Sequence, residues 1–594
     1  MPSVTWTCAR GFVGVDAFLW AGLTQGQGYK YTTMDNGAGL PISSKTFIDG
    51  DYVYSSLHIQ QPMQFITVQG SSSTTFKPPP LDGSCLLPDV IDHHAQHNPD
   101  HPLYMYGGED GVAKTITWSH AVKAFRMVAH ISRMQVDIAG HDQSVPVVAI
   151  LASTDQITYL SMVAGIMLAG YVPFPLSTRN SDAAIAHLLQ STSCTHIFVG
   201  LDPSIQKLAG AAQARISLVG KALKIMPIPT FQESFEPSFA PEPLVAVKNA
   251  KLDEPAVILH SSGSTAFPKI ITLTHRVFWE SGLVPYYGEV DLCGEVLSVH
   301  AVPIFHLLGL VHLPFAAYTG MVVSGFSPAT PPLALSPDIV FDGAIASNST
   351  FIICAPTFLE SWARDSARIA AMKKFLTVIF GGGPLQPSVG DELVKKGVHL
   401  SQLYGLTESS CNTVFIPKSV PKDGWDYFPL SPHTDPALVP VEDSPGVYRV
   451  YFKKCATHTP SILNAFIEGV PALDTKDLIL RHPTNPKLWK FFGRHDDQIM
   501  HSNAEKTNPV PIEKILHEDP AIKYAIMFGR GYFNAGVIIF PEEAFDPINT
   551  PRVIEFRRKI WATVERANRF APTHSRIFKE VCPDGICVAS LIKL

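Results

Sequence analysis

From residue 86 onward the sequence alternates helix-like segments with short apolar runs that end in small or turn-forming residues. The runs are VPVVAILAS (145–153), YVPFPL (171–176), THIFVG (195–200), AVILHSS (256–262), TFIICAP (350–356) and LTVIFGGG (376–383). Between the first two, DQITYLSMVAGIMLAG (155–170) has the period of a helix and ends at a glycine. Strands that alternate with helices predict an α/β fold with a largely parallel sheet covered on both faces.

The chain of 594 residues is long enough for two to four domains. Residues 1–75 are rich in aromatics and glycine and end in a Ser/Thr run, and KPPP (77–80) is stiff and extended. We therefore predict an extension and linker over residues 1–75 and a large domain over 76–492. At FGRHDDQIM an apolar run gives way to a group of ionisable residues. We therefore predict that residues 493–594 form a small α+β domain.

Composition narrows the class of protein and its location. A formal net charge of −6 argues against a nucleic-acid-binding protein. Nine cysteines without a C-x-x-C pair, and no signal peptide, favour a cytoplasmic protein. The stretch 296–337 lacks Asp, Glu, Lys and Arg, but it contains prolines and histidines. We interpret it as buried core rather than a membrane span, because polar groups in lipid must be satisfied.

AVILHSSGSTAFPK predicts a strand that runs into a hydroxyl-rich turn followed by Lys269. Backbone N–H groups and hydroxyls in such a turn can wrap phosphate oxygens, and a lysine adds charge. The segment is not a G-x-x-x-x-G-K-[ST] loop, because it has one glycine. A serine-rich surface turn is the alternative on this segment alone.

Further segments follow it in a fixed order: PIFHLLG (303–309), FGGGPL (380–385), QLYGLTES (402–409), DTKDL (474–478) and FGRHDDQI (492–499). Together with SSGST they resemble the adenylate-forming superfamily of acyl-CoA synthetases, luciferases and peptide-synthetase adenylation domains. HPTNPKLWKFFGRHDDQIMHSNAEKTNPVPIEKIL and APTHSRIFKE resemble the adenylation part of fungal synthetase-like carboxylic acid reductases. The resemblance covers about residues 76–594. It implies a large N-terminal domain of parallel-rich sheets with helices, joined by a hinge to a small C-terminal α+β domain, apparently truncated here.

The resemblance assigns the nucleotide site. It implies a mobile phosphate loop from Ser261 to Lys269, Tyr404 beside the adenine, Thr407 at the α-phosphate and Glu408 as the ligand of Mg²⁺. It also implies Asp477 at the ribose hydroxyls, assisted by Arg494, with Asp496 at the hinge. Within the loop the contacting residues are Ser261, Ser262, Gly263, Ser264 and Thr265. Taken singly, Glu408 reads as a solvated carboxylate and Asp477 as a cap, so the order of the motifs carries the assignment.

The same resemblance places the acid beside His306 and Phe305, and it lets the chain pass close to ligand at Gly381, Gly382 and Gly383, which lack a Cβ. His306, Lys269, Thr407 and Glu408 are the implied catalytic residues, although a histidine in an apolar run is more often a core residue. The implied reaction uses ATP and Mg²⁺, with CoA or a carrier protein supplied in trans as thiol acceptor. No carboxylate near PIFHLLG can hold an ammonium group, so we expect an aryl, α-keto or other non-amino acid.

Four positions depart from the family pattern. Ala266, Ile270 and Ala504 stand where glycine is usual, and Ile586 follows Gly585 where a lysine is usual; Lys593 is the lysine nearest to it. The chain thus reads as a free-standing adenylation unit, a fragment of a longer reductase, or a diverged, non-catalytic nucleotide-binding paralogue with a regulatory or partner-binding role. His93, His97 and His101 have helical spacing for a metal site, but Pro99 is expected to end that helix first.

Overall fold

The computed structural model describes most residues from 65 to 588, together with the backbone of the antiparallel strands β1 (Trp20–Gly22) and β2 (Lys30–Thr32). Outside the description lie residues 1–19, 23–29, 33–64, 137–144, 219, 221, 238–249, 262–267, 330, 334, 419–423, 443, 496–498, 501–505, 508, 530–534, 547–548, 572–574, 579–585 and 589–594. The chain divides into two units, Met1–Gln61 and Pro62–Leu594, and β1 and β2 belong to the first.

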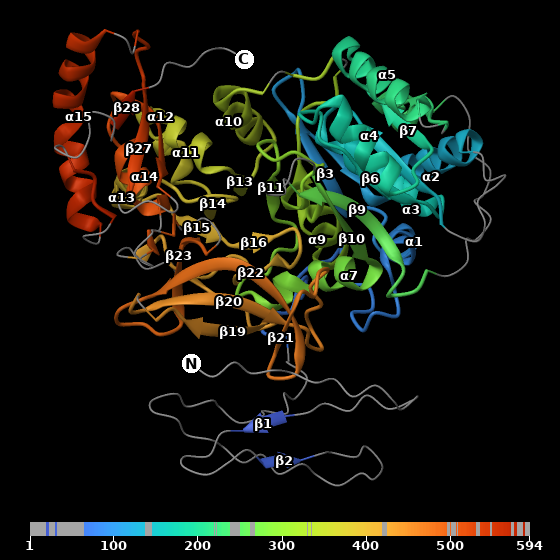
Figure 1. The fold of residues 1–594 in the computed structure, drawn as a ribbon. Coiled ribbons are helices and arrows are strands. Elements are labelled where there is room, and N and C mark those ends of the chain that lie inside the picture. The colour runs from blue at the N-terminus through green and yellow to red at the C-terminus, as the bar shows by residue number, and fades with distance from the viewer. Residues whose placement is uncertain are drawn as a thin grey trace. The chain divides into compact units, whose positions relative to one another are not determined.

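A four-stranded parallel sheet has the order β6-β5-β7-β8. Two of its strands, β6 and β7, are labelled in Figure 1. Its strands are β5 (Val147–Leu151), β6 (Val172–Pro175), β7 (His196–Val199) and β8 (Lys224–Pro227). The helices around it are α2 (Trp118–Gln135), α3 (Gln156–Leu168), α4 (Asp182–Ser191), α5 (Pro203–Ser217) and the short α6 (Phe231–Phe235). Ala149 and Leu151 pack in one core with α4 and α5, whereas Val148 and Ile150 pack in another with α2 and α3. The predicted covering of both faces is confirmed.

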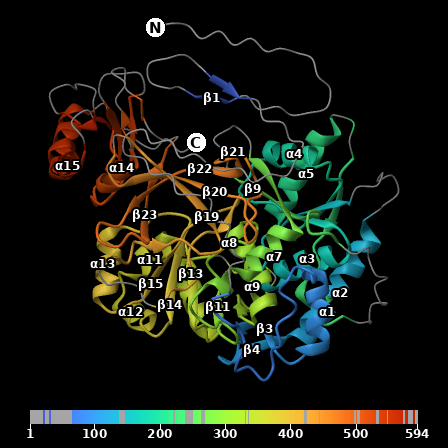
Figure 2. The same ribbon diagram turned by 90° about the horizontal axis from the view of Figure 1, so that it is seen from below.

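A seven-stranded sheet has the order β15-β14-β13-β11-β12-β3-β4 and is parallel except for the pair β3 and β4. Its strands are β3 (Pro102–Gly107), β4 (Ala113–Thr117), β11 (Val296–Ser298), β12 (Val322–Ser324), β13 (Phe351–Cys354), β14 (Thr377–Gly381) and β15 (Leu400–Leu403). Its helices are α1 (Leu87–His97), α7 (His275–Leu283), η1 (Val284–Tyr287), α8 (Leu307–Leu310), α9 (His312–Thr319), α10 (Pro337–Ala346), α11 (Pro356–Trp362), α12 (Ser366–Met372) and α13 (Pro387–Lys395). Figure 2 shows α2 beside β3 and β4, and α1 packs against α2.

One strand pairs differently from the sequence prediction. The pattern predicts β9 (Pro255–Ser261) as a further parallel strand, whereas it pairs antiparallel with β10 (Lys269–Thr274) in a two-stranded sheet. The physical reason is the short connection between Ser261 and Lys269, because a parallel crossover needs a dozen or more residues. The predicted phosphate loop therefore connects the two strands of a hairpin, with Ser261 opposite Lys269.

The third large sheet is antiparallel, with the order β18-β23-β22-β20-β19 and β21 paired to β22. Its strands are β18 (Phe428–Pro429), β19 (Asp435–Pro440), β20 (Val447–Lys453), β21 (Ala465–Ile467), β22 (Val470–Arg481) and β23 (Leu488–Arg494). A separate small hairpin is formed by β16 (Gly405–Leu406) and β17 (Ser410–Cys411). This hairpin and the strands β22 and β23 carry most of the described nucleotide-site candidates.

The C-terminal part has its own core and the predicted α+β character. Its strands are β24 (Ile499–Met500), β25 (Lys506–Thr507), β26 (Ile522–Phe528), β27 (Gly536–Pro541) and β28 (Ile586–Val588), and its helices are α14 (Pro509–His517) and α15 (Thr550–Phe570). β26 lies antiparallel and β28 parallel to β27. Leu516 of α14, Ile539 of β27 and Ile560 of α15 are fully buried together.

The uncharged stretch 296–337 forms β11, α8, α9 and β12 in the interior of the large core, as predicted. Its buried histidines have local partners: His300 Nδ1 lies 2.8 Å from Ser298 Oγ, and His312 Nδ1 donates to the carbonyl oxygen of Gly309 at 3.0 Å. Among the described helices, none combines the length and the apolar character that crossing a membrane requires.

Helix α1 ends at His97, as predicted from Pro99, and His101 lies beyond it. His101 donates to the carbonyl oxygen of Gly320 at 2.8 Å and contacts Thr75 Oγ1 at 2.9 Å. Segment 65–76 packs on the same unit, since Phe76 is buried and Gln69 is 1% exposed. The domain boundaries at residues 75 and 492 stay predictions.

Candidate active site

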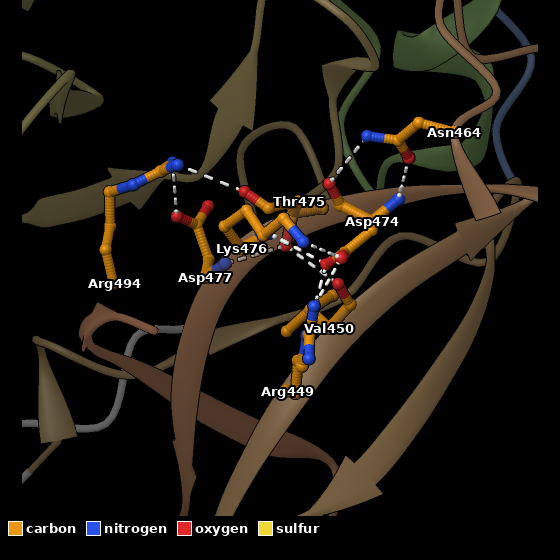
Figure 3. Close-up of polar contacts among 8 residues, drawn as sticks. All are labelled: Arg449, Val450, Asn464, Asp474, Thr475, Lys476, Asp477 and Arg494. Atoms are coloured by element: carbon orange, nitrogen blue, oxygen red, sulfur yellow. Dashed lines mark hydrogen bonds and ion pairs between the residues drawn. The ribbon is translucent and has the colours of Figure 1, made fainter. Parts of the chain in front are cut away.

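Three of the predicted nucleotide-site residues meet at the antiparallel sheet. Asp477 of β22 is 3% exposed, and Arg494 Nη1 on the neighbouring strand donates to its Oδ1 at 3.0 Å (Figure 3). Tyr404, which follows β15, donates its hydroxyl to Asp477 Oδ2 at 2.8 Å. Both carboxylate oxygens of Asp477 thus accept a hydrogen bond, one from Tyr404 and one from Arg494.

The ring of Tyr404 is buried and stacks on Phe428, with ring centroids 5.3 Å apart. Burial raises the pKa of Tyr404 well above its ordinary value, and the negative charge of Asp477 adds to that effect. The tyrosine is therefore a neutral hydrogen-bond donor that orients Asp477. The contact between the two residues was not expected from the sequence.

A second carboxylate lies three residues before Asp477. Asp474 accepts hydrogen bonds from Arg449 and Lys476, and its own N–H donates to Asn464 Oδ1 at 2.7 Å (Figure 3). Burial acts to raise the pKa of Asp474, but the two cationic partners outweigh it and the pKa lies below 3.8. Lys476 has φ +62°, a left-handed conformation that non-glycine residues rarely adopt. Lys476, in this left-handed conformation, lies between Asp474, which pairs with two cations, and Asp477.

Thr407 and Glu408 lie at the tip of the β16–β17 hairpin and are both half-buried. The backbone makes this turn very close, because a Cβ on Gly405 would lie 2.4 Å from the carbonyl oxygen of Ser410. Asn412 N donates to the carbonyl oxygen of Tyr404 at 2.9 Å and closes the base of the hairpin. The hairpin therefore connects the Tyr404–Asp477 contact at its base with the carboxylate of Glu408 at its tip.

The residues implied for the phosphate loop are only partly described. Ser262, Gly263, Ser264 and Thr265 lie outside the described residues, and of Ser261 the backbone alone is described. Lys269 is exposed at the start of β10, directly across from Ser261. Gly382 and Gly383 follow β14, and Gly382 has φ +80°, which explains the glycine.

His260 and Arg179, which the sequence pattern did not single out, both interact electrostatically with His306 of the predicted acid pocket. His260 directly precedes Ser261, is 5% exposed and accepts from the N–H of Ser177 through Nε2 at 3.0 Å. Burial lowers the pKa of His260 to about 4, and His306 contributes to the same direction. The neutral ring therefore carries its proton on Nδ1. A polar residue at the end of a strand, just before a phosphate-loop pattern, is the signal that could have identified it.

His306 is exposed and occupies the N-cap of α8, while Phe305 is buried beside it with ring centroids 4.8 Å apart. Desolvation lowers the pKa of His306, and the charge of Arg179 lowers it further. Arg179, His260 and His306 thus come from three separate segments. Asp496, the predicted hinge, lies outside the described residues, as do Ala266, Ala504 and Lys593; Ile586 begins β28.

The comparisons with known proteins agree with this geometry. Residues 91–442 match the family described as AMP-binding enzyme, and residues 496–585 match the AMP-binding enzyme C-terminal domain. The chain belongs to the AMP-binding enzyme family, and the suspected resemblance is confirmed.

Fungal reductases are among its relatives. Over 546 residues the chain is 40% identical to adenylate-forming reductase Nps10 of Heterobasidion annosum, covering 89% of this chain and 49% of that protein. Over 529 residues it is 28% identical to a carboxylic acid reductase of Neurospora crassa, covering 84% and 48%. The chain spans about half the length of the curated relatives it matches.

The fold is also that of solved adenylate-forming enzymes. O-succinylbenzoate coenzyme A synthetase (MenE) from Bacillus subtilis, in complex with ATP and magnesium ion, matches with a TM-score of 0.63 at 18% identity. The match covers 84% of this chain and 95% of that one. The predicted fold class, a large domain of parallel-rich sheets with a small C-terminal α+β domain, is thereby confirmed.

Proposed function

We propose that this chain activates a non-amino carboxylic acid with ATP, forming an acyl-adenylate. The observation that carries the proposal is the position of the Asp477 carboxylate between Tyr404 and Arg494, at the base of the hairpin whose tip carries Glu408. A buried carboxylate suits the ribose hydroxyls, because its oxygens accept hydrogen bonds from O–H donors. Thr407 beside Glu408 suits an α-phosphate oxygen, because its hydroxyl is a hydrogen-bond donor.

The donor set fits a magnesium ion. Mg²⁺ prefers oxygen ligands and is usually held by one or two carboxylates together with substrate phosphates and water. Glu408 offers a half-buried carboxylate on a tight hairpin, so it is the residue that would hold the ion. When bound, the ion would neutralise phosphate charge and favour departure of pyrophosphate.

In the proposed reaction a carboxylate oxygen of the acid attacks the α-phosphorus of ATP. A carbon–oxygen–phosphorus linkage forms, the bond from the α-phosphorus to the bridging oxygen breaks, and pyrophosphate leaves with the electron pair. Lys269 and the Ser261–Thr265 segment are proposed to hold the phosphates. His306 and Phe305 are proposed to orient the acid, with Gly382 and Gly383 letting it approach the backbone.

The acyl group is proposed to pass to the thiol of CoA or of a carrier protein. The thiol sulfur attacks the acyl carbon, a thioester forms, AMP leaves and the thiol proton is released. The fungal relatives named as reductases and the synthetase named for coenzyme A support a thiol acceptor. We propose a cytoplasmic location, which the cysteine usage favours: six cysteines among the described residues are free thiols.

ATP–pyrophosphate exchange with a panel of acids tests this function. Benzoate-like and α-keto acids should support exchange better than L-amino acids, because no acidic residue occurs between residues 296 and 337 to pair with an ammonium group. A clear preference for a free L-amino acid would overturn the substrate class. Mg·ATP binding without exchange for any acid would instead identify a non-catalytic paralogue.

A further inference from the structure

Glu280 is a buried carboxylate on the helix that follows the predicted phosphate-loop hairpin. It lies in α7 and is 6% exposed. Thr459 donates to it twice, from its N–H to Oε2 at 2.7 Å and from its hydroxyl to Oε1 at 2.9 Å. A buried carboxyl group needs hydrogen-bond partners, so Glu280 and Thr459 depend on each other.

Thr459 belongs to a segment between β20 and β21, residues 455–461, which we name the support loop. The support loop contacts the hairpin of Glu408 at two points. Ser461 N donates to the carbonyl oxygen of Glu408 at 2.7 Å, and His458 Nε2 donates to the carbonyl oxygen of Ser409 at 2.9 Å. Burial lowers the pKa of His458 to about 4, so the neutral ring donates through Nε2.

Helix α7 also reaches the hairpin directly. Ser281, the neighbour of Glu280, donates to Ser410 Oγ at 3.0 Å. Ser410 has φ +60°, a conformation that persists in non-glycine residues where surrounding contacts enforce it. The turn that carries Glu408 is therefore held from α7 by two routes, one through Ser281 and one through Glu280 and the support loop.

We propose that Glu280 is a positioning residue for acid activation: through Thr459 and the support loop it fixes the backbone of Glu408 and Ser409. This inference rests on the proposed function, in which Glu408 holds Mg²⁺. Glu280 does not touch the reacting groups in this account. Its effect is to aim a ligand, as residues behind a metal ligand do.

The charged surroundings of Glu280 offer a matched control. Asp253, Arg276, Glu280, Lys454, Cys455, Ala456 and Thr459 line a cavity of about 500 Å³. Asp253 is exposed and pairs with Arg276 at 2.8 Å. The variant Asp253→Asn changes the charge of the same cavity and leaves the hydrogen bonds of Thr459 intact.

Pyrophosphate exchange with the best acid of the panel, at varied Mg²⁺ and ATP, should separate positioning from general stability. Glu280→Ala should lower kcat or apparent Mg²⁺ affinity by about 10- to 100-fold, the range for removing a group that orients a metal ligand. Glu280→Gln should restore most of the activity, because the amide can accept from Thr459 N–H and donate to its hydroxyl oxygen. Asp253→Asn should match the wild type.

Hydrogen exchange read by mass spectrometry tests the contact itself without activity. In Glu280→Ala the peptides covering 404–412 and 455–463 should exchange faster than in the wild type, while peptides of β5 and β7 stay unchanged. Unchanged protection in both site peptides, or equal loss of activity in the alanine and glutamine variants, would overturn the inference. A wild type without exchange activity whose site peptides respond as expected would refute the proposed function and leave the support-loop contact established.

Discussion

Replacing Glu280 with glutamine should change how the stability of the protein depends on pH. Burial raises the pKa of Glu280 from 4.5 to about 7; the hydrogen bonds from Thr459 and the charges of Arg276 and Lys454 only partly oppose this. The folded state therefore binds a proton that the unfolded state releases between these two pH values. The contribution of Glu280 to the free energy of unfolding is present below pH 4.5 and is lost as pH rises through 7.

The expected loss is about 3 kcal/mol, at about 1.4 kcal/mol for each tenfold change in proton affinity. For a folded unit of this length that corresponds to a difference of about 3 °C in Tm. Titratable groups that face Glu280 are Arg276 on its own helix, Lys454 on the opposite segment and Tyr287 of η1. The hydrogen bond with Asp253 raises the pKa of Arg276, and burial raises the pKa of Tyr287 to about 12, so neither of these two groups titrates between pH 5 and 8.

The assay is thermal unfolding of the wild type, Glu280→Gln and Asp253→Asn at pH 5, 6, 7 and 8. The Tm of the glutamine variant relative to the wild type should rise with pH across this range. The pKa of Asp253 lies below 3.8 through its pairing with Arg276, so Asp253→Asn should run parallel to the wild type. Parallel curves for the wild type and Glu280→Gln would refute the reasoning and show that Glu280 is ionised throughout.

Three further predictions concern the proposed site. Glu408→Gln should keep the fold but lower pyrophosphate exchange by about 100-fold or more, the scale for a key electrostatic group, and unchanged exchange would remove Glu408 from the site. Asp477→Asn should raise the KM for ATP by about tenfold or more, because a charged acceptor is lost while the Tyr404 hydroxyl keeps a partner; an unchanged KM would exclude a ribose contact. Ile586→Lys should accelerate acyl-adenylate formation in single-turnover assays, and Lys593→Ala should abolish turnover if the tail lysine substitutes for it. Fast turnover in the wild type, with equal rates in the Ile586→Lys and Lys593→Ala variants, would show that the tail has another role.

The strands were predictable because strands buried on both faces have no polar positions to obscure the apolar run. Val148 and Leu151 are both fully buried although they face different cores. The pairing of β9 was not predictable from its apolar run alone, because a buried run looks the same in a parallel and an antiparallel sheet. The length of the connection to the next strand decides between the two pairings.

In the site, too, the sequence indicates the residues but not the contacts between residues that are far apart in the chain. Tyr404 and Asp477 are 73 positions apart, and the order of motifs suggested the site but not their hydrogen bond. Glu280 was missed because one glutamate on an amphipathic helix usually faces solvent. Its hydrogen-bond donor is Thr459, 179 positions along the chain, and no local sequence pattern indicates such a contact.

The two-faced burial of the central strands has a consequence for how the chain reaches its native state. A parallel sheet forms only after long intervening segments have closed, so its strands stay unpaired until late in folding. During that time the apolar runs of β5, around Ile150, and of β7, around Phe198, expose side chains on both faces of the strand. Neither run contains an Asp, Glu, Lys or Arg residue. Such segments associate between chains, and large proteins that populate intermediates are most vulnerable at high concentration. The yield of soluble protein should therefore be set by the rate of synthesis and the supply of chaperones more than by the final stability of the fold.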